Sequence, residues 1–399
     1  MNTLTNRIEN IDALRGFALA GIVLAHFTEN YVGGPIAESL DEAIHLGTPD
    51  EIADGLVFFF IRGKFFALFS FLFGLSFYLQ MHRAAKKGIN YGARFLWRIL
   101  ILFGIGYVHH LFYRGDILTV YAIVGVFLIP FYKIPVKWLF VASAIIFSGV
   151  IRLALFYSTQ GNPIVYDAPM KPDSEEVLAY YKILADGSLA EVFKSNSIEG
   201  FLMKMEFQFG VFSRGYLTFG FFLLGLAIGK TELFENYKQH LKKIKKVLLF
   251  LIIPFMAFGA ATGFFMKGEE SFDLKSLDTN LGLIFYDLVN LTMTIAIVCI
   301  FFMAWNRKWG YKFLNSFNSY GRMALTNYIL QTLIGTFVLY GWGMGYIGDI
   351  RVAYMILIAF AFIAIQVFLS DWWLKRFNYG PIEWLWRCLT HFKMFPFVK

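Results

Sequence analysis

The chain has 399 residues, of which 58% are hydrophobic, 19% aromatic and 16% charged. Ordinary soluble domains are about 45–50% apolar and about 25% charged, so this composition excludes a soluble protein and predicts a polytopic membrane protein. The formal net charge of +8 does not indicate nucleic-acid binding here, because membrane proteins retain Lys and Arg in their cytoplasmic loops.

Ten apolar runs are long enough to cross a bilayer, which takes about 20 helical residues. They lie at about 11–32, 64–81, 93–112, 115–133, 135–157, 209–229, 247–266, 281–304, 319–341 and 353–374. We therefore expect an all-α fold, a polytopic membrane helix bundle of about ten transmembrane helices, with residues 1–399 forming a single transmembrane domain.

The charges of the connecting segments predict the orientation of this bundle. Segment 82–98 holds five Lys or Arg and no acid, and the connections 230–246 and 306–322 are also basic. On the other side of a ten-helix thread, residues 33–54 hold six acids and no Lys or Arg, and the long segment 158–208 is net acidic. Since cytoplasmic loops carry the excess of Lys and Arg, both termini are expected in the cytoplasm.

Arg15 and His26 lie within the first apolar run, LRGFALAGIVLAHF. An arginine inside a membrane span costs about 3 kcal/mol by insertion scales, so its presence indicates a function. Eleven residues are about three helical turns, so the two side chains share roughly one face, about 16 Å apart along the axis. This pattern favours binding or chemistry on a charged substrate. The structural alternatives are that Arg15 reaches the headgroups and that His26 bonds to a nearby carbonyl or hydroxyl.

The turn between the third and fourth runs, in GYVHHLFYRGDILTVYA, holds His109, His110, Arg114 and Asp116. Consecutive helical residues point about 100° apart, so at most one of the two histidines faces a given cavity. Asp116 follows a glycine at the start of an apolar helix, where a carboxylate accepts from free backbone N–H groups and can also hold a neighbouring His or Arg. An imidazole oriented by a carboxylate is the usual general-base arrangement.

Segment 158–208 is too long for a plain connector. Its second part has helical character, with Val177, Leu178 and Tyr181 alternating with polar residues. We expect this extracytoplasmic loop to form short amphipathic helices on the outer membrane surface that cap the cavity of the bundle. Residues 49–62 are expected to lie on that surface in the same way, before the second span.

The ninth run, SYGRMALTNYILQTLIGTF, begins with Arg322 at the cytoplasmic mouth and continues with Asn327, Tyr328 and Gln331. Asn327 and Gln331 are four residues apart and therefore share a helix face. Amides in a span either join helices through hydrogen bonds or line a substrate path, and the sequence leaves both roles open.

Common cofactor and metal motifs are absent from the chain, which has no Walker loop, dinucleotide fingerprint, HExxH or CxxC pattern. Its two cysteines, Cys299 and Cys388, are too few and too poorly spaced for a disulfide framework or a metal site, so no metal is expected. The glycines of GFALAG and GFFLLGLAIG indicate close helix contacts. Near the C-terminus, GPIEWLWR is typical of an interfacial helix, in which Glu383 and Arg387 form an i, i+4 pair.

Four stretches that span nearly the whole chain resemble a bacterial membrane family called YeiB-like, or domain of unknown function 418. They are IDALRGFALAGIVL, KFFALFSFLFGLSF, GYVHHLFYRGDILTVYA, and GRMALTNYILQT with GPIEWLWR. The opening motif is also similar to that of the transmembrane acyltransferase superfamily, which includes bacterial O-acyltransferases of surface glycans and lysosomal heparan acetyltransferase. The resemblance implies a location in the inner membrane of a bacterium.

The resemblance also assigns residues. In the O-acyltransferases an Arg and a His of the first helix are functional, and they correspond to Arg15 and His26. The single His before GDIL in the YeiB-like family corresponds to His109 by its spacing from Gly106, which makes His110 the bystander.

We derive two main hypotheses. The first is a transacylase that moves an acyl group from a cytoplasmic acyl-CoA, such as acetyl-CoA, to an envelope glycan, lipid or small metabolite. In it Arg15 and Arg322 bind the CoA phosphates, and His26 or His109 deprotonates the acceptor or carries the acyl group. It requires a cavity that crosses the membrane between the first, third and ninth runs.

The second hypothesis is a transporter or flippase of a small or lipid-linked anion, in which intramembrane Arg and His bind and couple to protons. The apolar runs read as continuous, which disfavours it, because many transporters carry broken helices in inverted repeats. A non-enzymatic envelope scaffold or sensor is a third reading. The sequence leaves the acceptor and the formation of a homo-oligomer open.

Overall fold

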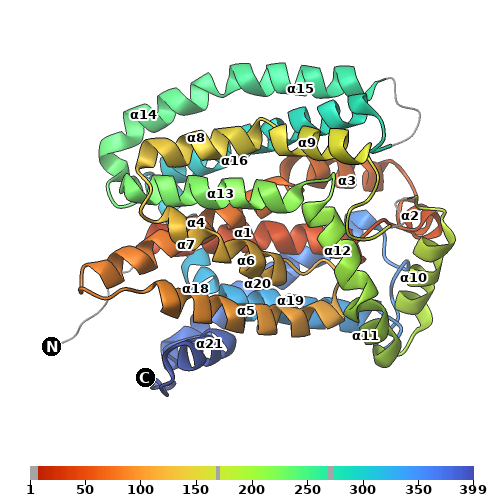
Figure 1. The fold of residues 1–399 in the computed structure, drawn as a ribbon. Helices are drawn as coiled ribbons and strands as arrows, with labels where there is room; N and C mark the ends of the chain where they lie inside the picture. The colour runs from red at the N-terminus through yellow and green to blue at the C-terminus, as the bar shows by residue number, and fades with distance from the viewer. Residues whose placement is uncertain (1–7, 168–170, 268–272) are drawn as a thin grey trace.

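The computed structural model describes residues 8–167, 171–267 and 273–399, and in these ranges the chain is helical, without a β-sheet (Figure 1). The longer helices are α1 (Glu9–Thr28), α4 (Lys64–Ala85), α5 (Gly92–Phe112), α13 (Arg214–Lys230), α14 (Tyr237–Phe250), α15 (Ile252–Met266), α16 (Leu277–Trp305), α19 (Ala324–Leu339) and α20 (Val352–Arg376). The shorter ones are α2 (Glu38–Ile44), α3 (Thr48–Phe60), α6 (Leu118–Val126), α7 (Leu128–Phe131), α8 (Val136–Phe147), α9 (Val150–Thr159), α10 (Glu175–Asp186), α11 (Leu189–Ser197), α12 (Glu199–Phe209), α17 (Lys308–Asn315), α18 (Phe317–Arg322) and α21 (Pro381–His391). The predicted all-α membrane bundle is confirmed.

The structure does not confirm the expected count of ten spans. In the described ranges six helical stretches are long and apolar enough to cross a membrane, or up to eight if each of two bent helix pairs is one span. The expected run 115–133 divides at Phe127 into α6 and α7, which are too short to span separately. The expected run 319–341 divides at Met323 into α18 and the 16-residue α19. The count of ten is therefore not confirmed.

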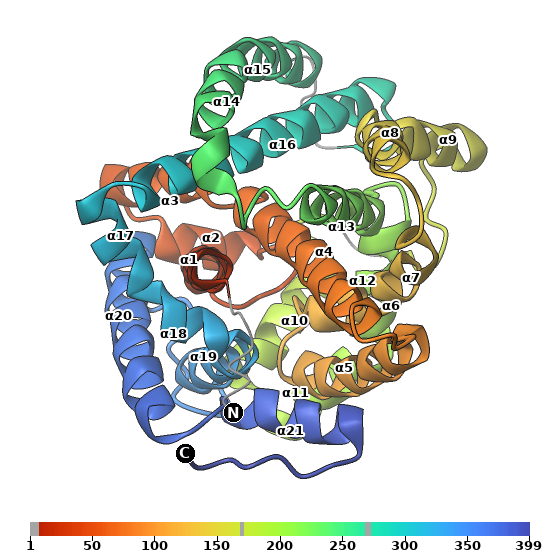
Figure 2. The same cartoon turned by 90° about the vertical axis from the view of Figure 1, so that its left-hand side faces the viewer.

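Helix α1 lies at the centre of the bundle, where α4, α18, α19 and α20 pack around it (Figure 2). Most of its residues are buried, as expected for a helix that is apolar on nearly all faces. Two glycines bring its neighbours close: a Cβ added to Gly16 would overlap the carbonyl of Phe317, and one added to Gly21 would overlap the ring of Phe65. The glycine contacts expected from GFALAG therefore occur.

Helices α4 and α13 make an equally close contact. A Cβ at Gly74 would overlap the backbone of Phe222, and a Cβ at Gly225 would overlap the carbonyl of Phe71. Each helix thus presents a glycine to the backbone of the other, as in the small-residue contacts of membrane helices.

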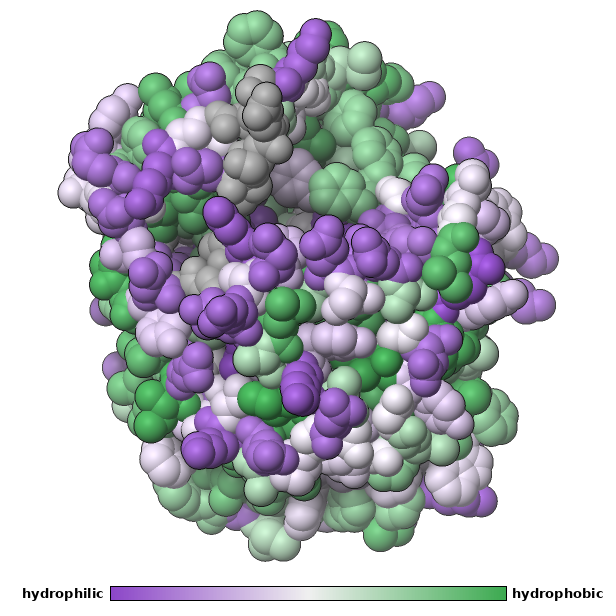
Figure 3. Space-filling model, turned by 90° about the vertical axis from the view of Figure 1, so that its right-hand side faces the viewer, coloured by the Kyte–Doolittle hydropathy of each residue, from purple (hydrophilic) through white to green (hydrophobic). Residues whose placement is uncertain are grey.

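The two ends of the bundle differ. The start of α1, the C-terminus and α21 lie at one end, on the left in Figure 1. We call this the basic end because Arg15, Arg83, Arg98, Arg322 and Arg387 line one cavity there. Helices α10, α11 and α12 stand across the opposite, capped end (Figure 1). Figure 3 looks onto the capped end and shows polar side chains over much of it. That the basic end faces the cytoplasm, and that segment 158–208 is extracytoplasmic, stay predictions.

Candidate functional site

A cavity of about 400 Å³, the basic-end cavity, reaches from the basic end into the bundle between α1, α4, α5, α19 and α21. Its polar lining includes five arginines and two acids, namely Arg15, Arg83, Arg98, Arg322, Arg387, Asp12 and Glu383. Its deeper lining is mainly apolar and aromatic, and it includes Ile117, Tyr121 and Tyr328. One part of the cavity therefore suits anionic groups, and the other suits an apolar chain.

Arg15 is held at the wall of this cavity by protein groups. Its Nη1 donates to Asp12 Oδ1 at 2.7 Å, one turn earlier, and its Nη2 donates to Ser76 Oγ of α4 at 3.0 Å. The side chain is 23% exposed and lines the cavity, as does Arg322 at the end of α18. Two of the predicted anion-binding residues are thus together at the basic end.

His109 and Asp116 form a buried pair at the other end of α5. His109 Nδ1 lies 2.8 Å from Asp116 Oδ1, and both residues are almost fully buried. Asp116 also accepts from the backbone N–H of Leu118 and Thr119, at 3.1 and 3.0 Å, and from the Thr119 hydroxyl at 2.8 Å. The carboxylate therefore binds the first free N–H groups of helix α6 and also orients the imidazole of His109. His109 Nε2 is buried and has no hydrogen-bond partner in the part of the chain that the structure describes.

Lys204 of α12 completes this buried group, although no pattern in the sequence points to it. Its Nζ donates to Thr119 Oγ1 at 2.7 Å and to His110 Nδ1 at 2.9 Å, and lies 3.6 Å from Asp116 Oδ2. His110 therefore has an ammonium group on its Nδ1, whereas His109 has a carboxylate there. Consecutive histidines on one helix are placed in opposite electrostatic surroundings.

His26 of α1 lies near the His109–Asp116 pair. Its Nδ1 is 3.0 Å from the side-chain nitrogen of Gln331, whose carbonyl oxygen accepts from the Tyr31 hydroxyl at 2.6 Å. The imidazole packs edge-on against Tyr113, with ring centroids 5.0 Å apart. His26 thus faces Gln331 of α19 and Tyr113, the residue that follows α5.

Tyr328 contacts both the basic-end cavity and the two histidines, His26 and His109. Its ring centroid is 4.9 Å from that of His109 and 6.1 Å from that of His26, and its hydroxyl accepts from Ile117 N at 3.3 Å. The same residue lines the basic-end cavity, as Arg15 and Arg322 do, whereas neither histidine does. The ring of Tyr328 therefore lies between the cavity and the two histidines.

The two amides of α19 separate into two roles. Gln331 contacts His26, as described above. Asn327 instead donates to Ser370 Oγ of α20 at 2.9 Å, and its backbone carbonyl accepts from Gln366 at 3.1 Å. Asn327 therefore joins α19 to α20, and it is not among the residues that line the basic-end cavity, so its substrate-binding role stays a prediction.

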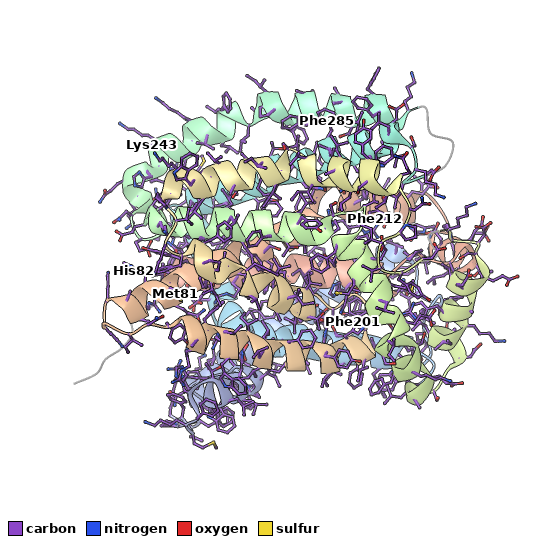
Figure 4. All side chains as sticks on the ribbon, viewed as in Figure 1. Met81, His82, Phe201, Phe212, Lys243 and Phe285 are labelled. Carbon is purple, nitrogen blue, oxygen red and sulfur yellow. The ribbon has the colours of Figure 1, made fainter. Side chains whose placement is uncertain are left out.

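The capped end covers the histidines. Arg114 donates to Asn196 at 2.9 Å and to the Ser195 hydroxyl at 2.7 Å, and its guanidinium lies 3.4 Å from the ring centroid of Tyr180. Phe201, labelled in Figure 4 between α12 and α5, packs edge-on against His110 at 5.7 Å. These contacts hold α10–α12 over the end of α5. Within the described residues, the cavity that leads toward the His109–Asp116 pair comes from the basic end.

Glu383 does not pair with Arg387, and the expected i, i+4 ion pair is wrong. Its carboxylate accepts from the backbone N–H of Leu325 at 2.7 Å, and from the N–H and hydroxyl of Thr326 at 3.1 and 2.5 Å. It therefore caps the start of α19, where free N–H groups and the helix dipole favour a carboxylate. Through this contact α21 is held against α19 and forms one wall of the basic-end cavity.

Burial of the carboxylate raises the pKa of Glu383 above its ordinary value of 4.5, although the bonds from Thr326 act in the opposite direction. The folded state then holds the proton more tightly than the unfolded state. This contribution is complete below pH 4.5 and is lost as the pH rises through the raised pKa. Relative to Glu383→Gln, the wild type should gain stability on acidification from neutral pH, by about 2 °C or more in Tm.

This expectation is checked by thermal unfolding of both proteins between pH 7.5 and pH 5. The exposed Glu235→Gln is the charge-matched control, and its Tm should follow the wild type. Parallel Tm curves for the wild type and Glu383→Gln would contradict the assignment.

No group of three or more His, Cys, Asp or Glu residues in the described ranges is arranged to hold a metal ion. The arrangement instead offers an oriented imidazole, a cationic cavity mouth and an aromatic boundary between them.

The chain matches two family models. Residues 228–393 match "Protein of unknown function (DUF418)", and residues 7–184 match "Heparan-alpha-glucosaminide N-acetyltransferase, catalytic". The second match contains Arg15, His26, His109 and Asp116, and the first contains the site residues of α18 and α19.

Three relatives are similar along almost their whole length. Uncharacterized protein YxaH of Bacillus subtilis is 30% identical over 424 residues, covering 100% of this chain and 98% of YxaH. An uncharacterized 39.9 kDa protein from the amylase 3′ region of Bacillus acidopullulyticus is 30% identical over 406 residues, covering 99% and 97%. Uncharacterized protein YeiB of Escherichia coli is 27% identical over 395 residues, covering 95% of each chain.

Proposed function

The chain belongs to the YeiB-like family that carries domain of unknown function 418, and from this premise we propose that it is a membrane-embedded acyltransferase. An acyl group passes from a cytoplasmic acyl-CoA, such as acetyl-CoA, to a hydroxyl or amine of an envelope glycan, lipid or small metabolite. The match of residues 7–184 to the catalytic region of an N-acetyltransferase supports the reaction class.

The observation that carries the proposal is the buried His109–Asp116 pair with its vacant Nε2. A carboxylate that accepts from Nδ1–H leaves the lone pair on Nε2, and it stabilises the imidazolium that forms when Nε2 takes a proton. His110 is unsuited to this role, because its Nδ1 accepts from the Lys204 ammonium. His26 has an amide partner and no carboxylate, so we assign it to positioning the acceptor.

The transfer step follows from this geometry. Nε2 of His109 takes the proton of the acceptor O–H or N–H, and the freed lone pair forms a bond to the thioester carbonyl carbon. The tetrahedral intermediate then breaks its C–S bond, and the CoA thiolate takes the proton from Nε2–H. Asp116 keeps its charge throughout, held by the N–H groups of α6 and by Lys204.

The donor enters from the basic end in this proposal. Arg15 and Arg322 bind its phosphate groups at the mouth, because guanidinium groups bind phosphate through paired, charge-assisted hydrogen bonds. The pantetheine arm then runs along the apolar lining toward Tyr328. That ring separates the end of the cavity from His109, so its side chain must turn aside for the thioester to reach Nε2.

The direct test is incubation of the purified full-length protein in nanodiscs with radioactive acetyl-CoA. We expect CoA release, by transfer to an added acceptor or by slow hydrolysis. Arg15→Gln should raise KM at least about tenfold, since a charge-assisted hydrogen bond contributes about 1.5–3 kcal/mol. The exposed Arg307→Gln is the matched control and should behave as wild type. Absence of binding, hydrolysis and transfer would contradict the proposal.

A transporter or flippase of an anion is the second candidate, and one observation favours it. The pairs α8–α9 and α12–α13 are bent by 42° and 60° at short breaks, so the apolar runs are not all continuous. Broken helices of this kind occur at transporter binding sites. Substrate flux into proteoliposomes without any acyl donor would support this alternative.

A further inference from the structure

Arg98 and Arg387 are two of the three basic-end arginines that have no role in the donor binding proposed above. Arg98 of α5 and Arg387 of α21 line the cavity together with Arg15. Each guanidinium lies over an aromatic ring, Arg98 at 3.5 Å from the ring centroid of Trp386 and Arg387 at 5.2 Å from that of Tyr379. Stacking covers the flat face of a guanidinium and leaves its N–H edge available.

The acids of the cavity do not neutralise these two arginines. Asp12 bonds to Arg15 at 2.7 Å, and Glu383 is occupied by the donors of Leu325 and Thr326. Within the residues that the structure describes, neither Arg98 nor Arg387 has a carboxylate at ion-pair distance. In addition, Arg387 Nε is buried and has no hydrogen-bond partner there.

Several positive charges are thus held close together in the lining of the basic-end cavity. Arg15 and Arg387 both lie close enough to Arg98 for their charges to repel it. Holding half-buried cations side by side costs free energy, and a bound anion offsets that cost. Arg98 and Arg387 come from α5 and α21 whereas Arg15 comes from α1, so cations from three different helices line one cavity.

We propose that Arg98 and Arg387 form a second anion subsite, and that the ligand of this cavity carries two separate phosphate groups. This inference rests on the proposed function in one respect, the identity of the ligand. CoA has the required chemistry, since its ribose 3′-phosphate is separate from the 5′-diphosphate that Arg15 and Arg322 would bind. Two other sources offer a phosphate for one subsite only: an anionic lipid headgroup, and a diphosphate that is not part of CoA.

The test compares CoA with dephospho-CoA, which lacks only the 3′-phosphate. Binding to the full-length protein is measured by calorimetry in nanodiscs of phosphatidylcholine. Wild type should bind CoA at least about tenfold more tightly than dephospho-CoA. Arg98→Gln and Arg387→Gln should remove that difference and leave dephospho-CoA binding unchanged, whereas Arg98→Lys should retain part of it. Arg15→Gln should weaken both ligands.

The remaining outcomes separate the subsite from the proposed function. Equal binding of the two nucleotides by wild type, or an unchanged difference in both Gln variants, overturns the second subsite while leaving CoA as the donor. If neither nucleotide binds but inorganic pyrophosphate does, and Arg98→Gln weakens it, the subsite holds and acyl-CoA is wrong. If only nanodiscs with phosphatidylglycerol stabilise the protein through Arg98, the occupant is a lipid, and the two-phosphate ligand is overturned.

Discussion

Replacement of His109 by glutamine is expected to lower the rate constant of acyl transfer by about 10²–10⁴-fold, the range typical of a lost general base. Glutamine keeps a side-chain N–H that can donate to Asp116, so the local structure is retained while the proton acceptor at Nε2 is lost. The neighbouring His110→Gln should lower the rate by less than about tenfold, because the Nδ1 of His110 already accepts from Lys204. Initial rates of radioactive acetyl transfer at saturating donor measure both effects.

Four measurements make this comparison specific. CoA binding should be unchanged in His109→Gln, since the cavity lining that holds the donor does not include His109. Equal losses in His109→Gln and His110→Gln would contradict the assignment of the base. A larger loss in His26→Ala than in His109→Gln would transfer that role to His26. Thermal unfolding of each variant separates a lost base from a lost fold.

Replacement of Gly225 by alanine is expected to destabilise the folded protein by more than about 3 kcal/mol, an unusually large effect for one methyl group. The new Cβ would overlap the carbonyl of Phe71 and lie 2.8 Å from Leu75 N. Both atoms belong to the backbone of α4, so no rotation of a side chain relieves the overlap, and α13 must move away from α4. The expected result is a large fall in Tm and in the yield of monodisperse protein.

The chain offers matched controls on α15. Gly259 and Gly263 also lie in a membrane helix, but a Cβ at either position meets no atom within 4 Å. Gly259→Ala and Gly263→Ala should therefore leave Tm unchanged or raise it slightly, because alanine is the better helix former by about 1 kcal/mol. A Tm for Gly225→Ala equal to theirs would contradict the close contact of α4 and α13.

Much of the helical architecture followed from the sequence because long apolar runs have few alternatives in a membrane. The runs that became α4, α5, α16 and α20 were placed to within a few residues. The breaks inside the runs were not predicted. The one at Phe127 has a local cause, because Pro130 has no N–H to donate to the carbonyl of Val126. The one at Met323 has no proline beside it, and hydropathy does not report it.

The candidate site was predictable where its residues are close in sequence. The contact between His109 and Asp116 spans seven residues and crosses one turn, so a carboxylate beside a histidine was expected there. The contacts of Lys204 with Thr119 and His110 span 85 and 94 residues. A single lysine in FLMKMEF carries no signal of its partners. Glu383 was misassigned for the same reason, because its donors lie 57 and 58 residues away.

The sparsely packed helix α15 has a practical consequence. None of its residues is buried within the described structure, whereas both cysteines of the chain, Cys299 and Cys388, are. A cysteine introduced at an exposed α15 position, such as Met256, would therefore be the one accessible thiol against two concealed ones. A fluorophore or spin probe attached there would report depth in the bilayer from a helix whose side chains the rest of the protein barely constrains.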